Sequence, residues 1–179
     1  MKKVTFPHMN ALHILQVGAG GIGSAVVADL ARLIHSVGEL CTISYRIADG
    51  DRVEESNLLR QNFINPDLAK NKAMVLAERY SRAYGIPISY SDQYVTDKKT
   101  FDDLLFPPDG YDWHKGIIIL GCVDDNGARK LMHEVYHVPE PELRSDYETI
   151  LVSSSAGIDS TGTLRWALKN FPKGVGTTF

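Results

Sequence analysis

The sequence predicts an α/β fold: a Rossmann-like, doubly wound and mostly parallel sheet with helices on both faces and two C-terminal strands. Three observations predict it. Short apolar runs alternate with helical patterns along the chain, which is typical of βαβ units. A glycine-rich turn, GAGGIG at residues 18–23, separates the first apolar run from the first helical pattern. The run GIIILGC at residues 116–122 is the most strand-like stretch of the chain.

The first half of the chain predicts strand, turn, helix and strand in that order. Residues 12–17 read as a buried strand, and residues 24–35 as a helix with a broad apolar face. Residues 41–48 form the second strand, which ends at Asp49. Beyond it, Ser56 is placed to cap a short helix that runs through Arg60 towards Phe63.

The second half continues the alternation. The run LVSSSA and the run GTLRWALK, joined at GIDSTG, have the apolar character of two further strands. In chain order we expect a helix at 72–84, a strand at 86–90, a short helix at 101–106, a strand at 116–122, a helix at 126–138 ended by Pro139, and strands at 150–156 and 162–169.

Length and charge limit the function classes. The 179 residues suit one domain, which we place at 1–179; whether the C-terminus is truncated stays open. A net charge of −3 offers no electrostatic footprint for nucleic acid or an anionic membrane. No apolar run approaches the ~20 residues of a membrane span, and the N-terminus lacks the apolar core of a signal peptide.

The two cysteines predict a reducing compartment. Cys41 and Cys122 both lie inside apolar, strand-like runs, so we expect buried thiols with no disulfide framework and no CxxC zinc pair. A cytoplasmic location follows from this expectation.

The glycine turn predicts an anion site. In a GxGxxG pattern between a strand and a helix, Gly18 allows the tight turn, Gly20 lets a phosphate approach the backbone, and Gly23 lets the helix pack on the strand. The helix N-terminus beyond Gly21 offers free N–H groups to the phosphate. The alternative is a packing turn with no ligand.

Polar side chains after the second strand favour a nucleoside triphosphate over a dinucleotide. A carboxylate at Asp49 can accept hydrogen bonds from ribose hydroxyls. A guanidinium binds phosphate bidentately, an ammonium acts as a point charge, and amides add neutral donors. The candidate nucleotide-binding residues of this stretch are Asp49, Asp51, Asn57, Arg60, Gln61 and Lys72.

Asp124 is the candidate metal ligand. It follows the strand at 116–122, and ligands of open α/β sheets bind at the carboxyl ends of strands. A carboxylate opposite a phosphate-binding face suits Mg²⁺. For each of these charged residues taken alone, a solvated surface side chain is the commoner explanation.

Together these segments resemble a known family. VGAGGIGS, ADGDRVEESNLLRQ, Lys72 and CVDDNGAR are similar to the adenylating enzymes of the ThiF/MoeB/ubiquitin-activating superfamily, from about residue 12 to about residue 168. The long connection between the first helix and the second strand is more similar to ThiF-family proteins of bacterial plasmid (PRTRC-type) gene clusters.

The resemblance implies an ATP-binding domain that adenylates the C-terminal carboxylate of a small ubiquitin-like (β-grasp) protein and releases pyrophosphate, working as a homodimer. By position, Asp49 would hold the ribose, Asp124 would hold Mg²⁺, and Arg60, Lys72 and Asp124 would serve catalysis. Asp124 is preferred to Asp125 because it lies five residues before Arg129, as in the family. The chain departs from the family in three ways: no arginine precedes the glycine turn, no cysteine follows Cys122, and CxxC pairs are absent.

Three alternatives stay open. A non-catalytic partner or scaffold subunit of the same fold would explain the departures. An NAD(P)-dependent oxidoreductase would use the glycine turn but leaves Asn57, Arg60 and Lys72 unexplained. A zinc metalloprotease is suggested by HEVYH at residues 133–137, although Pro139 ends that helix at once and no third histidine follows.

Overall fold

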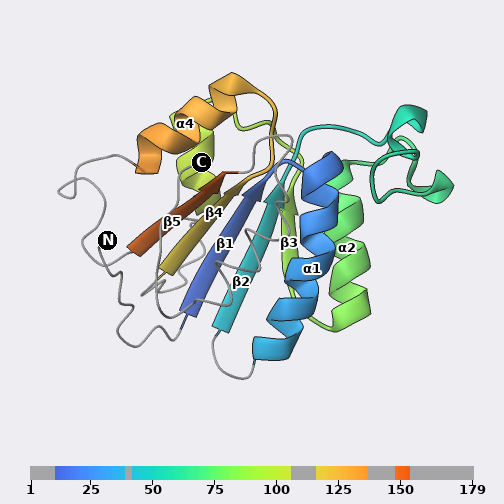
Figure 1. Cartoon of the computed structure of the whole chain (residues 1–179), viewed down its shortest axis with the longest axis horizontal. Helices are drawn as coiled ribbons and strands as arrows, with labels where there is room; N and C mark the ends of the chain where they lie inside the picture. The colour runs from blue at the N-terminus through green and yellow to red at the C-terminus, as the bar shows by residue number, and fades with distance from the viewer. Residues whose placement is uncertain (1–10, 39–41, 106–115, 137–147, 154–179) are drawn as a thin grey trace.

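A computed structural model describes residues 11–38, 42–105, 116–136 and 148–153. They form one five-stranded sheet of strand order β3-β2-β1-β4-β5, and every neighbouring pair is parallel (Figure 1). The elements are β1 (Ala11–Val17), α1 (Gly21–Val37), β2 (Thr42–Ala48), η1 (Glu55–Asn57), η2 (Asn65–Asp67), α2 (Lys72–Tyr84), β3 (Ile88–Ser91), α3 (Lys98–Leu105), β4 (Gly116–Gly121), α4 (Asn126–Tyr136) and β5 (Glu148–Ser153).

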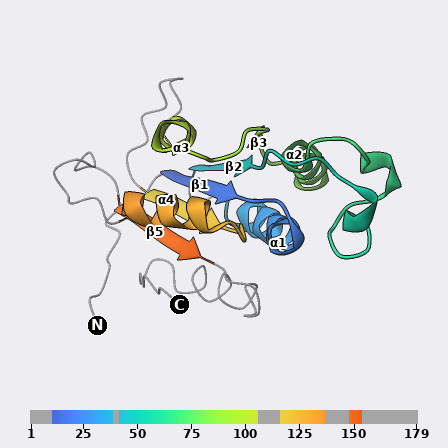
Figure 2. The ribbon, with the colours of Figure 1, turned by 90° about the horizontal axis from the view of Figure 1, so that it is seen from above.

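Helices cover both faces of the sheet, which confirms the doubly wound α/β prediction. Side chains alternate along β1, so Leu12 and Ile14 pack under α1 and α2, whereas Leu15 and Val17 pack against α3 and α4. Figure 2 shows α1 and α3 on opposite sides of the strands. The two cores are separate layers, each closed by its own pair of helices.

The predicted boundaries hold best where capping signals are strong. The α2 helix spans the predicted 72–84; Asn71 caps its first turn by accepting a hydrogen bond from the Met74 N–H, and Gly85 in the left-handed region ends it. By contrast, α1 begins three residues earlier than predicted, at Gly21, because the turn is already helical there.

Two predictions fail in the described residues. The helix expected from Ser56 to Phe63 is only the 3-10 turn η1, which Glu54 caps and in which the Asn57 side chain accepts a hydrogen bond from the Glu54 N–H. The chain beyond η1 is held against α1 instead, where the Asn62 N–H donates to the Ser24 hydroxyl at 3.2 Å. Cys122 is partly exposed, since β4 stops one residue before it. Cys41 and the strand expected at 162–169 lie outside the described residues.

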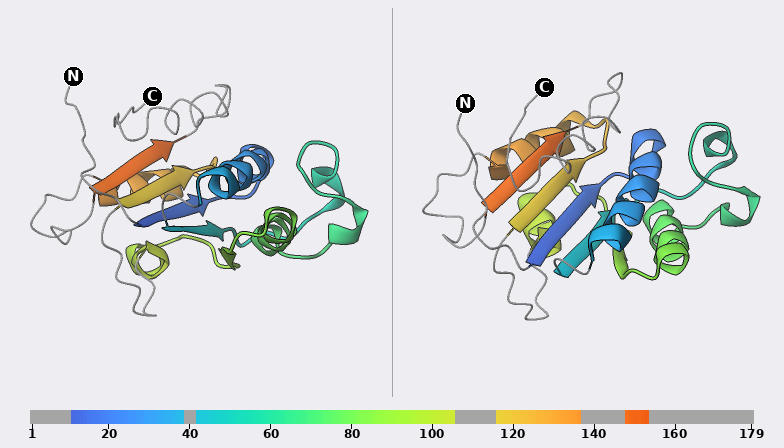
Figure 3. Two further views of the ribbon diagram at one scale, coloured as in Figure 1. Left: turned by 90° about the horizontal axis from the view of Figure 1, so that it is seen from below. Right: turned by 60° about the horizontal axis from the view of Figure 1, so that its bottom comes forward.

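The loop between β2 and α2 stands apart from the sheet. Figure 3 shows residues 53–70 beyond α2, with η1 and η2 inside this segment. Its ends are joined, because the Val53 N–H donates to the Lys70 carbonyl at 2.8 Å and the Ala69 N–H donates to the Val53 carbonyl at 2.9 Å. It is therefore an Ω-loop with closed ends.

No helix among the described residues is both long and apolar enough to cross a membrane.

One buried histidine gives the fold a pH dependence. His13 on β1 lies between the Ser44 hydroxyl and the Leu104 carbonyl of α3, at 3.2 and 3.3 Å. Burial lowers its pKa from 6.5 to about 4, the Leu104 carbonyl opposes that shift, and the Arg46 charge adds to it. The ring is therefore neutral in the fold at neutral pH.

We expect the free energy of unfolding to fall by about 3 kcal/mol from this residue alone as the pH drops from 6.5 to 4, because the unfolded chain then binds the extra proton. Urea unfolding of the wild type and of His13→Asn at several pH values in this window measures the difference. Equal pH slopes for the two proteins would contradict the assignment.

Candidate nucleotide-binding site

The glycine turn is built by close backbone approach. Gly18 has a φ of +100°, and a Cβ there would lie 2.6 Å from the Cys122 carbonyl oxygen. A Cβ on Gly23 would lie 2.2 Å from the Gly18 carbonyl oxygen. Neither position has room for a side chain, so the roles predicted for these two glycines agree with their surroundings.

Gly20 and Gly21 differ from the other two glycines of the turn. A Cβ built on either one meets no heavy atom of the described residues within 4 Å, so the space above them is open in this part of the chain. This opening lies at the N-terminus of α1, where backbone N–H groups have no helical partner. The turn therefore has room for an anion, and the binding of one there stays a prediction.

A buried glutamine supports the turn from below. Gln16 is fully buried on β1, and its side-chain amide donates to the carbonyls of Gly18 and Gly23 at 2.8 and 3.1 Å. Its Oε1 accepts a hydrogen bond from the Tyr45 hydroxyl at 2.6 Å, and burial raises the pKa of that phenol well above its ordinary value. Gln16 was not predicted as a site residue, although an amide inside an apolar strand next to a glycine turn is a usable signal.

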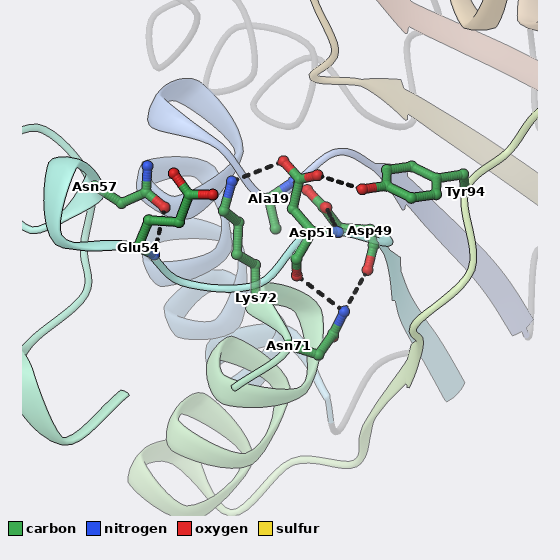
Figure 4. A network of polar contacts seen from close by, with 8 residues as sticks. All are labelled: Ala19, Asp49, Asp51, Glu54, Asn57, Asn71, Lys72 and Tyr94. Carbon is green, nitrogen blue, oxygen red and sulfur yellow. Dashed lines mark hydrogen bonds and ion pairs between the residues drawn. The ribbon is translucent and has the colours of Figure 1, made fainter. Parts of the chain in front are cut away.

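Asp49 joins the end of β2 to the glycine turn. Its Oδ2 accepts from the Ala19 N–H at 2.5 Å and its Oδ1 accepts from the Asp51 N–H at 2.8 Å (Figure 4). Burial raises the pKa of this carboxyl, while the two backbone hydrogen bonds lower it. Each oxygen keeps a second lone pair for a ribose hydroxyl, so Asp49 can both shape the turn and bind a ligand.

Asp51, two residues after Asp49, forms an ion pair with Lys72. The Lys72 ammonium lies 2.8 Å from Asp51 Oδ2, and the Tyr94 hydroxyl donates to Asp51 Oδ1 at 2.6 Å. Lys72 is only 6% exposed, so its charge needs this partner. The ion pair with Lys72, and next the Tyr94 hydrogen bond, hold the pKa of Asp51 below its ordinary range.

Asn71 fixes the position of Lys72. Its side-chain nitrogen donates to the backbone carbonyls of Asp49 and Asp51, at 2.6 and 3.1 Å, while its oxygen caps α2. The Lys72 N–H also donates to the Asp51 carbonyl at 2.9 Å. Asn71 and Tyr94 are further site residues that the sequence analysis missed.

The Ω-loop residues are only partly brought together. Asn57 is buried and its oxygen is used within the loop, whereas Arg60 is exposed. Because the helix expected from Ser56 is only the turn η1, it does not present Asn57, Arg60 and Gln61 on one helical face. The Gln61 Oε1 is buried and has no hydrogen-bond partner among the described residues. Such an atom is expected where a water or ligand supplies the missing donor.

Asp124 and Asp125 play different parts beyond β4. Asp125 Oδ1 accepts from the Ala128 N–H at 2.8 Å and so caps α4. Asp124 is exposed in the same segment, at the carboxyl edge of the sheet. This difference supports the choice of Asp124 as the metal ligand, which stays a prediction.

The HEVYH motif lies away from these contacts. His133 and Glu134 are exposed on α4, Glu134 lies 3.8 Å from Lys130, and His137 is outside the described residues. Among the described residues, no group of three histidines, cysteines or acidic side chains could hold a metal ion.

The glycine turn, Gln16 and the Asp51–Lys72 pair lie together at the carboxyl edge of the parallel sheet. This is the edge at which open α/β sheets bind their ligands. The ThiF family model matches residues 6–163. This chain belongs to the ThiF family. Among curated proteins, none matches it in sequence.

Solved structures share the fold of this ThiF-family chain. E. coli tRNA N6-threonylcarbamoyladenosine dehydratase, TcdA, in complex with ATP is 23% identical with a TM-score of 0.57, over 83% of this chain and 54% of that one. E. coli MccB with AMPCPP and MccA is 19% identical with a TM-score of 0.54, over 78% of this chain and 36% of that one. The ThiF-family chain thus spans about a third to a half of the length of these proteins.

We expect Gly23→Ala to lower the free energy of unfolding by about 1–3 kcal/mol, because its methyl group would collide with the Gly18 carbonyl. Chemical denaturation measures this. Gly21→Ala is the matched control: its methyl group meets open space, and its stability should stay close to wild type. Equal losses in both variants would contradict the close-packed turn.

We expect Lys72→Met to raise the pKa of Asp51 towards its ordinary range, because Lys72 is the largest cause of the lowered value. Tyr94→Phe removes the second cause and should give a smaller rise. NMR titration of the Asp51 carboxyl carbon follows both. A pKa that stays the same in Lys72→Met would rule out the ion pair in solution.

Proposed function

We propose that this ThiF-family chain catalyses ATP-dependent adenylation of the C-terminal carboxylate of a small ubiquitin-like, β-grasp protein. The observation that carries the proposal is the buried Lys72, aimed with Asp51 at the carboxyl edge where the glycine turn opens. The ATP complex of TcdA and the structure of MccB with AMPCPP and MccA, which share the fold, support it.

The chemistry follows from charge. A carboxylate oxygen of the partner attacks the α-phosphorus of ATP, the bond to the bridging oxygen breaks, and pyrophosphate leaves with its electron pair. Negative charge grows on the phosphates, so catalysis consists mainly of positioning and cationic stabilisation. Lys72 supplies a point charge, and Arg60 a bidentate donor that is free to move because it is exposed.

The remaining residues position the nucleotide. The open face over Gly20 and Gly21 would receive a phosphate, and Asp49 the ribose hydroxyls. The unpartnered Gln61 Oε1 would accept a hydrogen bond from the ligand or its water shell. Asp124 would hold Mg²⁺ together with phosphate oxygens, since Mg²⁺ commonly takes one or two carboxylates at such sites.

Two further features complete the proposal. The protein would act in the cytoplasm, and it would act as a homodimer, as the family resemblance implies. Neither feature enters the local chemistry described above.

We expect calorimetric titration to show binding of Mg·ATP and little binding of NAD⁺. Arg60→Ala should weaken ATP at least about ten-fold, because a charge-assisted hydrogen bond is worth about 1.5–3 kcal/mol. Arg82→Ala is the matched control, since Arg82 is an exposed α2 arginine paired with Glu78. Tight NAD⁺ binding without ATP binding would overturn the proposal.

Activity is tested by exchange of labelled pyrophosphate into ATP in the presence of small β-grasp proteins. The same partner with an amidated C-terminus is the control, because it lacks the attacking carboxylate. Exchange that persists with the amidated partner would contradict the proposed acceptor.

A further inference from the structure

Tyr94 is the one exposed aromatic side chain among the described residues that contacts the Asp51–Lys72 pair. It follows β3 and is 61% exposed, yet its hydroxyl is fixed on Asp51 Oδ1 at 2.6 Å. An exposed hydrogen bond contributes little to folding, and so much exposed ring surface contributes little burial. The placement of the ring is therefore not explained by stability.

The ring lies directly over Gly50. A Cβ built on Gly50 would come within 2.6–2.7 Å of the Tyr94 ring atoms Cγ, Cδ2 and Cε2. Only a glycine at this position lets the aromatic ring approach the backbone that links Asp49 to Asp51. The Gly50 site thus accommodates the ring as Gly18 accommodates the Cys122 carbonyl.

The segment that carries Tyr94 is held in place on its other side. The next residue, Val95, is buried in the core that α3 and α4 cover. Asp97 then caps α3 by accepting from the Thr100 N–H at 2.9 Å. The ring is therefore presented from a fixed support, which lowers the entropy lost when a ligand packs on it.

The order of Lys72, Asp51 and Tyr94 along the site indicates which part of a nucleotide would reach the Tyr94 ring. In Figure 4, Lys72 and Tyr94 lie on opposite sides of Asp51, and Asp49 lies between the Ala19 N–H and the Tyr94 ring. A nucleotide whose phosphates approach Lys72 and the glycine turn, and whose ribose reaches Asp49, directs its base away from the turn. Tyr94 follows β3, which lies beyond β2 from the turn.

We propose that Tyr94 is a base-binding residue, an aromatic platform on which the purine ring of the nucleotide packs, with its orientation fixed by the hydrogen bond to Asp51. This inference rests on the proposed function, because it assumes that a nucleotide is the ligand. Packing of a base on an aromatic side chain is worth about 1–3 kcal/mol by alanine substitution. The contact is made by the ring, so the hydroxyl only orients it.

The test is calorimetric titration of the whole chain with Mg·ATP and, separately, with inorganic tripolyphosphate, which has no base. We expect Tyr94→Ala to weaken ATP about five-fold or more and to leave tripolyphosphate unchanged. Tyr94→Phe should stay within about three-fold of wild type, because the ring remains. Tyr90→Ala, which removes another exposed tyrosine, on β3, is the control and should change neither ligand.

Other outcomes overturn the inference in distinguishable ways. Unchanged ATP affinity in Tyr94→Ala refutes the platform and leaves the proposed function standing. Equal weakening of ATP and tripolyphosphate also refutes it, because Tyr94 would then act through Lys72. A wild type that binds neither ligand refutes both proposals, whereas NAD⁺ binding that is weakened by Tyr94→Ala refutes adenylation and supports the platform. Thermal unfolding of each variant confirms that it is folded.

Discussion

The close backbone contact around Gly18 is the constraint on which the site depends. Three strands reach the same edge here: the Gly18 N–H donates to the Ala48 carbonyl at 2.8 Å, and the Cys122 N–H donates to the Val17 carbonyl at 2.7 Å. These bonds extend the parallel pairing past the strand ends. The N-terminus of α1, Asp49 and the segment before Asp124 are therefore placed relative to one another by main-chain atoms.

The two aspartates after β2 have opposite environments. Burial raises the pKa of Asp49, and the Lys72 ion pair lowers that of Asp51, although only Gly50 separates them. Asp49 accepts hydrogen bonds from two backbone N–H groups, so it shapes the turn. Asp51 accepts its hydrogen bonds from the Lys72 and Tyr94 side chains, so it holds a charge and an aromatic ring beside the turn. The segment from Asp49 to Asp51 thus fixes the backbone of the turn with one carboxylate and balances the charge of Lys72 with the other.

Periodicity and glycine spacing predicted the fold because each element carries its own signal. The strand and helix patterns, the GxGxxG turn and the α2 boundaries were predicted from local sequence. The helix expected at Ser56 is only the turn η1, because the residues beyond it are held by contacts with α1, such as those of Asn62 with Ser24, which local sequence does not encode.

The site residues that the sequence did not reveal act over long separations in the chain. Tyr94 contacts a carboxylate 43 residues earlier, and Gln16 contacts a tyrosine 29 residues later. Spacing does not encode such contacts, since they depend on how the strands pair. Asn71 is different: an asparagine just before a helix is a local capping signal, and its bonds to the Asp49 and Asp51 carbonyls are what sequence could not supply.

The Ω-loop has an inner part that contacts α2 and an outer surface that is exposed to solvent. The inner part of the loop is tied to α2, because Arg79 of that helix pairs with Asp67 and donates to the Asn62 carbonyl at 2.6 Å. The outer surface of the loop carries Leu59, which is 92% exposed. The loop closes at Val53 before Asn71, so a substitution of Leu59 removes no hydrogen bond of the α2 cap. The exposed surface of the loop can therefore vary in sequence while the Asp51–Lys72 pair keeps its place beside the glycine turn.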